Sequence, residues 1–249
     1  MVAPAQAQAD QEAAAPPEAL RPTLAAHGGL DAFRQYGTLV YDFERRTEAA
    51  VIDDQQTIDL VQRNVRIESD DYTLGYNGSV TWITPGPDAL NYPASPGFYS
   101  STYFYFFAVP FVFADPGVNA EDAGQATVGG TTYDVVRISF GEGVGHAPED
   151  QYVLYVDPET GRAEMLRYSV TYGEMADDAA PNSVLVYREF QEAGGLVVPQ
   201  RGTFHAWNGG ALGPQKAEVV YTNVSFSSER PDASLFEVHD GAAIEEMPN

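Results

Sequence analysis

The residues whose types and spacing best fit chemistry are His146, Glu149 and Asp150, which lie in one segment after a predicted strand. An imidazole beside two carboxylates can bind a divalent cation or transfer protons, so this segment is the candidate site of a hydrolase or a metal-dependent enzyme. In a loop of a strongly acidic protein, however, three such side chains are more commonly just solvated. We therefore keep the segment as an alternative site and assign it no catalytic residue.

Three further groups could take part in catalysis or binding: the carboxylate pairs Asp53-Asp54 and Asp177-Asp178, and His205 with Trp207 on one face of a predicted strand. The carboxylate pairs are typical of a solvated surface, and the His-Trp pair is expected to pack on the sheet, with a sugar-binding surface as its alternative. The chain has no cysteine, no G-x-S-x-G elbow and no phosphate-binding or dinucleotide-binding loop. The sequence therefore predicts no catalytic residue, no metal site and no cofactor.

The charge of the chain excludes one large class of partners. Acidic residues number 36 against 13 basic ones, and the formal net charge is −23. Such a protein repels the phosphates of nucleic acids and of anionic membrane surfaces, so we predict neither as a partner. Repulsion among the acidic side chains also destabilises the folded protein in dilute buffer, and molar salt screens this repulsion within about 3 Å. The spread of acidic residues along the chain therefore predicts a protein from a salt-adapted bacterium.

The least polar part of the chain runs from residue 98 to residue 113 and reads FYSSTYFYFFAVPFVF. Nine of its sixteen residues are aromatic and none is charged. An aromatic side chain buries roughly 150–250 Å², which is worth roughly 4–6 kcal/mol at about 25 cal/mol per Å². The rest of the protein must therefore cover this segment, either permanently in the core or as the wall or lid of an apolar cavity.

Helical spacing within this segment predicts its shape. The pattern is carried by Tyr99, Tyr103, Phe106 and Phe107. We expect a short helix that Pro110 ends, followed by an extended stretch in which Phe111 and Phe113 point to one side. The run is shorter than the about 20 apolar residues that a membrane span needs, so no transmembrane segment is predicted.

The remainder of the chain alternates between apolar and polar residues, which predicts about nine or ten strands joined by hairpins. Asn77-Gly78 is the strongest hairpin signal. Residues 57–68 form one expected strand, in which the apolar positions change face and so predict a bulge or a strong bend. Long meandering strands favour a mainly β (α+β) fold, with one strongly curled antiparallel sheet and short helices on its concave face. A two-sheet sandwich is the competing architecture.

The first residues have a different composition. Residues 1–16 are rich in Ala, Gln and Pro and are expected to be disordered, whereas residues 17–249 are expected to form a single β domain. Ala5-Gln6-Ala7 and Ala7-Gln8-Ala9 have the small-x-small form of a signal-peptidase site. This predicts the remnant of a signal peptide and export to the periplasm or cell envelope, with a plain disordered tail as the alternative.

The order of these elements resembles the LolA/LolB-like fold of periplasmic lipoprotein carriers and, more narrowly, an uncharacterised exported bacterial family related to that fold. The residues that carry the resemblance are His27-Gly28-Gly29-Leu30-Asp31, Asn77-Gly78 with Trp82, Pro110-Phe111 with Asp115-Pro116-Gly117, Gly145 through Asp150 before Tyr152, and Tyr155-Val156-Asp157-Pro158. The resemblance implies a half-barrel closed by helices, with an apolar cavity of the kind in which these carriers hold acyl chains.

The sequence and the resemblance together predict a non-enzymatic exported binding or carrier protein. Its ligand would be an apolar small molecule, an acyl chain, a lipid or a lipoprotein, held in a cavity between the curled sheet and an aromatic lid. Lipoproteins or envelope proteins are the expected protein partners. The expected ligand-binding residues are Trp82, Tyr99, Tyr103, Phe104, Phe106, Phe107 and Phe111. The alternatives are a hydrolase or metal-dependent enzyme that uses the segment at His146, and an envelope scaffold with a solid core.

Overall fold

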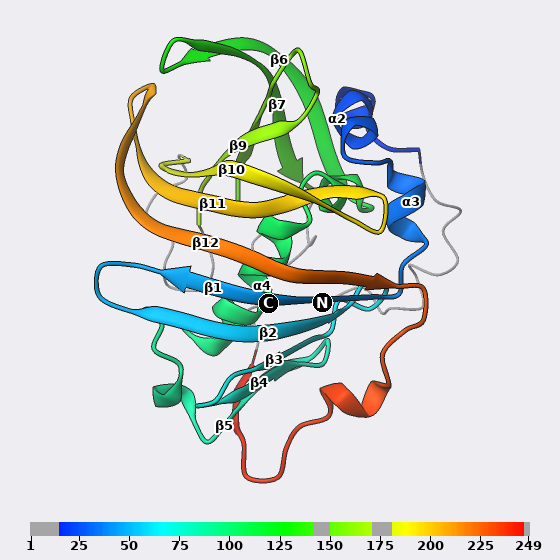
Figure 1. Cartoon of the computed structure of the whole chain (residues 1–249), viewed down its shortest axis with the longest axis vertical. Helices are drawn as coiled ribbons and strands as arrows, with labels where there is room; N and C mark the ends of the chain where they lie inside the picture. Colours follow the sequence, from blue (N-terminus) through cyan, green and yellow to red (C-terminus); the bar gives the residue numbers. More distant parts are fainter. Residues whose placement is uncertain (1–14, 142–149, 171–180, 247–249) are drawn as a thin grey trace.

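The strands of the protein form one antiparallel sheet, in which nearly every strand pairs with its neighbour in sequence (Figure 1). The computed structural model describes residues 15–141, 150–170 and 181–246. The thirteen strands of these residues lie in the order β13-β5-β4-β3-β2-β1-β12-β11-β10-β9-β8-β7-β6. Their bounds are β1 (Thr38–Arg46), β2 (Val51–Asp59), β3 (Val65–Glu68), β4 (Thr73–Tyr76), β5 (Val80–Thr84), β6 (Val118–Val128), β7 (Thr131–Phe140), β8 (Tyr152–Val156), β9 (Ala163–Tyr168), β10 (Ser183–Ala193), β11 (Leu196–Asn208), β12 (Ala211–Ser227) and β13 (Ala243–Glu246).

The helices of the described residues are few and short. They are η1 (Glu18–Leu20), α2 (Arg21–Ala26), α3 (Leu30–Arg34), η2 (Pro87–Ala89), α4 (Pro96–Phe107), η3 (Phe111–Ala114) and η5 (Ala233–Phe236). The sheet curls around α4, and its end strands β13 and β6 do not pair with each other (Figure 1). The prediction of a mainly β, strongly curled half-barrel with helices on its concave face is confirmed.

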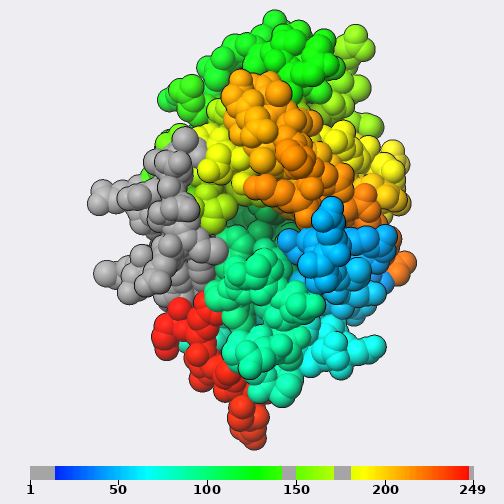
Figure 2. Space-filling view, turned by 90° about the vertical axis from the view of Figure 1, so that its left-hand side faces the viewer, coloured from blue at the N-terminus to red at the C-terminus, as the bar shows by residue number. Residues whose placement is uncertain are grey.

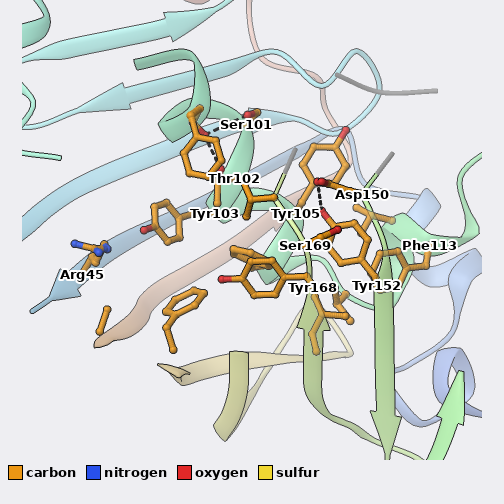
Figure 3. A pocket seen from close by; sticks show the side chains of 18 of the residues that line it. Arg45, Ser101, Thr102, Tyr103, Tyr105, Phe113, Asp150, Tyr152, Tyr168 and Ser169 are labelled. Carbon is orange, nitrogen blue, oxygen red and sulfur yellow. Dashed lines mark hydrogen bonds between the residues drawn. The ribbon is translucent and has the colours of Figure 1, made fainter. Parts of the chain in front are cut away.

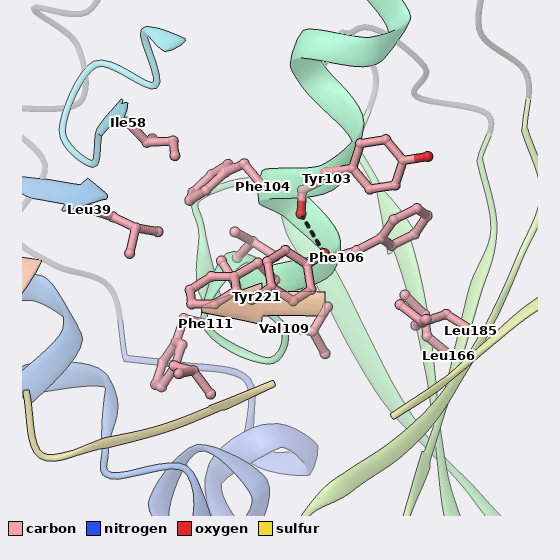
Figure 4. Packing of buried hydrophobic residues seen from close by; sticks show 14 of the residues in the cluster. Leu39, Ile58, Tyr103, Phe104, Phe106, Val109, Phe111, Leu166, Leu185 and Tyr221 are labelled. Atoms are coloured by element: carbon pink, nitrogen blue, oxygen red, sulfur yellow. Dashed lines mark hydrogen bonds between the residues drawn. The ribbon is translucent and has the colours of Figure 1, made fainter. Parts of the chain in front are cut away.

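Helix α4 forms where the aromatic spacing predicts a helix. Ser95 caps its first turn by accepting a hydrogen bond from the Phe98 N–H at 3.3 Å, and Pro96 occupies the first helical position. Apolar side chains surround the helix, so it needs cover on more than one side. Figure 4 shows Phe104 directed toward Leu39 and Ile58, while Phe106 points away from them, toward the strands that carry Leu166 and Leu185.

The stretch after Pro110 differs from the expected extended conformation. Residues Phe111–Ala114 form the 3-10 helix η3. The ring of Phe111 stacks on that of Phe33 with centroids 4.5 Å apart, and Arg63 binds Asp115 at 2.8 Å just beyond the helix. These contacts come from segments distant in sequence, and they favour a compact turn over an extended strand.

The single strand expected at residues 57–68 is two strands, β2 and β3. Ile58 and Val65 face each other across this hairpin, so the change of face in the sequence marks a turn and not a bulge. The carboxylate of Asp59 accepts hydrogen bonds from the N–H groups of Val61 and Gln62 at 2.9 and 3.0 Å. An Asp side chain that satisfies backbone donors two and three residues later stabilises a turn without glycine or proline.

No helix within the part of the chain that the structure describes is long and apolar enough to cross a membrane.

His27 joins the N-terminal helices to the sheet. Its ring is 1% exposed; Nδ1 donates to the Val197 carbonyl oxygen at 2.7 Å, and Nε2 accepts from the Ala163 N–H at 3.1 Å. Only the neutral imidazole can make both bonds. Burial, opposed by the bond to Val197 and aided by the charge of Arg162, lowers the pKa of His27 from 6.5 to about 4. The histidine is therefore a structural tie between β9 and β11.

Asp54, which was expected to be solvated together with Asp53, is instead buried at the centre of the fold. It is 4% exposed and lies beneath α4, where its Oδ2 accepts hydrogen bonds from the hydroxyls of Tyr99 at 2.6 Å and Tyr72 at 2.7 Å. Gln56 donates to Oδ1 at 3.0 Å. Burial outweighs these three donors and raises the pKa of Asp54 from 3.8 to about 6. The network ties β2 and the residue that precedes β4 to the helix.

We predict that His27→Ala destabilises the protein most at neutral pH. The unfolded chain binds more protons than the folded one between pH 6.5 and about 4, so the contribution of His27 is present above this window and is lost as pH falls through it. The free-energy difference of unfolding between wild type and variant should shrink by about 3 kcal/mol from pH 7 to pH 4. Urea unfolding at several pH values measures it, and a constant difference would contradict the assigned role.

Asp54→Asn should remove a pH dependence of the unfolding free energy that is opposite in sign to the one contributed by His27. The folded protein binds the extra proton between pH 3.8 and about 6, so Asp54 makes the wild type more stable as pH falls through this window, by about 3 kcal/mol. The variant should lack this gain. Asp53→Asn is the matched control, because Asp53 is the exposed neighbour on the other face of β2. Equal pH profiles of unfolding free energy for the two variants would refute the prediction.

Candidate functional site

The concave side of the sheet contains a cavity of about 290 Å³ between α4, η3 and residues of β1, β7, β8, β9, β11 and β12. Figure 2 shows a face of the molecule that is hollowed between the teal-green segment that contains α4 and the yellow and orange strands. The volume is at the lower end of the about 300–1,000 Å³ typical of small-molecule sites. The cavity is lined by Arg45, Tyr92, Phe98, Ser101, Thr102, Tyr103, Tyr105, Phe106, Val109, Val112, Phe113, Phe140, Asp150, Tyr152, Leu166, Tyr168, Ser169, Val170, Phe204, Lys216 and Ala217.

The periodicity of each element places these side chains. One face of α4 supplies a wall of the cavity, through residues at i, i+4, i+7 and i+8: Phe98, Thr102, Tyr105 and Phe106. The strands supply the facing wall through inward positions, such as Leu166 and Tyr168 two residues apart on β9. Phe106 reaches across to these strands, with its ring centroid 4.9 Å from that of Tyr168.

A cationic and phenolic group forms one end of the cavity. The guanidinium of Arg45 lies 5.1 Å from the ring centroid of Tyr92, and the Tyr103 hydroxyl donates to the Tyr92 hydroxyl at 3.2 Å. Burial raises the pKa of Tyr92, Tyr103 and Tyr168, and the charge of Arg45 opposes the increase at each of them. All three phenols therefore stay protonated near neutral pH and act as hydrogen-bonding groups, not as bases.

The opposite end of the cavity is acidic. Figure 3 shows Asp150, Tyr152 and Ser169 grouped away from Arg45. The Tyr152 hydroxyl donates to Asp150 at 3.2 Å, and the Ser169 hydroxyl oxygen accepts from the Gln151 N–H at 2.8 Å. Burial, followed by the charge of Asp150, holds the pKa of Tyr152 well above its usual value. Most of the other lining side chains are apolar, so the arrangement suits a largely apolar molecule.

The residues predicted to bind a ligand separate into two groups. Tyr103 and Phe106 line the cavity. Tyr99, Phe104, Phe107 and Phe111 are fully buried in the core outside the cavity lining. The difference follows from the side of α4 that each side chain occupies. Side chains on the far side pack against β1, β2 and β12, as when the Phe107 ring stacks on Tyr41 at 4.9 Å.

Trp82 lies on the other face of the sheet. Its neighbour Thr81 is directed at α4, where its hydroxyl lies 3.4 Å from that of Ser100, so Trp82 points outward by strand alternation. There the indole covers Gly75 and donates to the Phe236 carbonyl oxygen at 3.3 Å. A side chain at Gly75 would overlap this ring, which explains the glycine. The structure does not bring Trp82 to the cavity.

The polar residues considered for catalysis do not gather in the described residues. Of the first candidate group, His146 and Glu149 lie outside these residues, as does Asp177-Asp178, and only Asp150 can be placed. Trp207 packs on the outer face of the sheet, 6.1 Å from the Tyr155 ring. Within the described ranges, no three His, Asp or Glu side chains form a cluster that could hold a metal ion.

Sequence reasoning missed the half of the cavity that the strands supply. Arg45, Tyr152, Tyr168 and Phe204 come from β1, β8, β9 and β11, and each continues the inward row of its strand. The alternation that predicts the strands also contains this information. It identifies which residues share a face, but the strand order is needed to show which of them surround one space.

Comparison with solved structures supports the fold. A LolA superfamily protein from Nitrosomonas europaea superposes with a TM-score of 0.51 at 10% identity, covering 85% of this chain and 97% of that one. A putative outer membrane lipoprotein-sorting protein domain from Vibrio parahaemolyticus gives 0.49 at 9% identity, with 88% and 94% covered. A DUF1329 family protein from Desulfovibrio piger gives 0.48 at 12% identity, with 86% and 97% covered.

The first of these similarities confirms the predicted LolA-like fold, and at such low identity it shows the fold alone. No curated protein sequence matches the chain. Residues 55–188 match the family described as "Family of unknown function (DUF6503)". Because this match covers more than half of the 249 residues, the chain belongs to the DUF6503 family.

Proposed function

We propose that this protein is an exported, non-enzymatic binding or carrier protein that holds an apolar ligand between its curled sheet and α4. The observation that supports the proposal most is the cavity itself, because ten of its 21 lining residues are aromatic. A preformed concave site with an apolar wall and a few polar groups is the usual form of a small-molecule site. The ligand class we propose is an acyl chain or a lipid.

The packing of α4 explains how one segment can serve both stability and binding. Phe104 and Phe107 are 2% and 1% exposed and fill the core on one side of the helix. On the other side Thr102 and Phe106 line the cavity. Binding therefore does not require the helix to leave the core, and we propose that α4 is a fixed wall of the site.

The alternative functions are less well supported. An envelope scaffold with a solid core is disfavoured by a cavity of about 290 Å³ at the centre of the concave face. A hydrolase at the segment of residues 146–150 rests on His146 and Glu149, which lie outside the described residues. Export to the periplasm or envelope is consistent with a LolA-like fold and is part of the proposal, and salt adaptation stays a prediction from composition.

Ligand binding is tested with Nile red, a neutral apolar dye, on delipidated protein. We expect saturable fluorescence enhancement with one site per chain, and an at least tenfold weaker Kd in Thr102→Trp, roughly the effect of 1.4 kcal/mol. The physical reason is that Thr102 lies on the cavity face of α4, where an indole would fill the space.

Thr132→Trp is the matched control, because Thr132 is exposed near the β6–β7 turn and outside the cavity lining. It should bind Nile red as the wild type does. Absence of saturable binding by the wild type would refute the proposed function. Equal loss in both variants, or loss in neither, would place the dye outside this cavity and refute the proposed site. Far-ultraviolet circular dichroism checks that each variant is folded.

A further inference from the structure

Arg45 interrupts the apolar inward row of strand β1. Leu39, Tyr41 and Phe43 occupy the preceding inward positions and are at most 1% exposed. Arg45 continues this row at the point where β1 reaches the cavity, and its side chain lines it. A cation at an inward position of a curled sheet is costly unless water or an anion satisfies it.

No carboxylate of the described residues forms an ion pair with Arg45. The other arginines near it are paired: Arg46 binds Glu44 at 2.8 Å on the opposite face of the strand, and Arg201 binds Glu189 and Glu218. Arg45 differs from these two arginines in its position, because its side chain lines the aromatic cavity. The contact that Arg45 does make is with the face of the Tyr92 ring, which leaves the hydrogen-bonding edges of the guanidinium available.

Phenol hydroxyls surround the same end of the cavity. The Tyr103 and Tyr92 hydroxyls are hydrogen-bonded to each other at 3.2 Å. Figure 3 shows the hydroxyls of Tyr103 and Tyr168 on the side of their rings that faces the Arg45 end. Lys216, the sole lysine of the chain, also lines the cavity from β12, which pairs with β1. Arg45 and a set of neutral donors therefore lie at one end of the cavity, while Asp150 lies at the other.

We propose that Arg45, with the neighbouring phenols, binds the anionic headgroup of a single-chain amphiphile whose apolar chain occupies the aromatic cavity. This inference rests on the proposed function and specifies its ligand class. The planar guanidinium fork matches a carboxylate or a phosphate, and the phenols donate further hydrogen bonds to the same oxygens. A cavity of about 290 Å³ suits one chain better than the two acyl chains of a membrane phospholipid.

The test uses four ligands with the same ten-carbon chain and different heads: decanoate, decyl phosphate, decanol and decyltrimethylammonium. Isothermal titration calorimetry on the full chain at about pH 8, where the carboxylic acid is ionised, measures each Kd directly. We expect the two anions to bind about tenfold or more tightly than decanol, and the cation to bind most weakly. The tighter of the two anions identifies the headgroup as carboxylate or phosphate.

Arg45→Gln should lower the affinity for decanoate and for decyl phosphate to that for decanol. The affinity for decanol itself should not change. Arg45→Lys should retain part of the preference, because it keeps the charge and loses the fork. Arg46→Gln is the matched control, since it removes the same charge from the next residue on the opposite face and should preserve the preference.

The outcomes separate this inference from the proposed function. If decanol binds as tightly as the anions, or if Arg45→Gln weakens all ligands alike, the headgroup proposal is overturned while the apolar cavity remains a binding site. If none of the four ligands binds, both proposals fail. If Arg46→Gln abolishes the preference as Arg45→Gln does, the selectivity reflects the net charge of the protein and the headgroup proposal is overturned.

Discussion

The structure depends on the need to bury a twelve-residue helix that has no polar face. Helix α4 contains seven aromatic residues and no charge, so water is an unfavourable neighbour on almost every side. A flat sheet can cover only one side of a helix. A long antiparallel sheet that curls covers more, and the thirteen described strands make such a surface. The fold is therefore the consequence of one segment that the chain must enclose.

The enclosure is not equally tight on the two sides of the helix. On one side the rings of Phe107 and Tyr221 pack with centroids 5.0 Å apart in the buried core. On the other side, side chains of α4 and of β7, β8, β9 and β11 line the cavity. A cavity on one side only is compatible with stability, since the other side fixes the helix.

Polar groups inside the fold have two different roles. Asp54 accepts three hydrogen bonds and both ring nitrogens of His27 are hydrogen-bonded, so these two groups hold elements together. Arg45 lies at the margin of the cavity, where it touches an aromatic face and no described carboxylate. Asp54 and His27 therefore act as structural ties, whereas Arg45 lines the cavity and is placed to contact a bound molecule.

The sequence by itself determined the class of fold, because strand alternation and the Asn77-Gly78 hairpin are local signals. It also predicted from aromatic spacing a short helix that ends before Pro110, and the structure has α4 there. It did not determine the turn between Ile58 and Val65, which an aspartate forms, or the compact η3, which distant contacts favour.

Only the tertiary structure decided which aromatic side chains border empty space. Trp82 and Phe106 are both large and apolar, yet one covers the outer face of the sheet and the other lines the cavity. Tyr168 and Arg45, which are 123 residues apart in sequence, line the same cavity because β9 and β1 curl around one helix. Local periodicity assigns a residue to a face, whereas the position of that face relative to other elements depends on long-range packing.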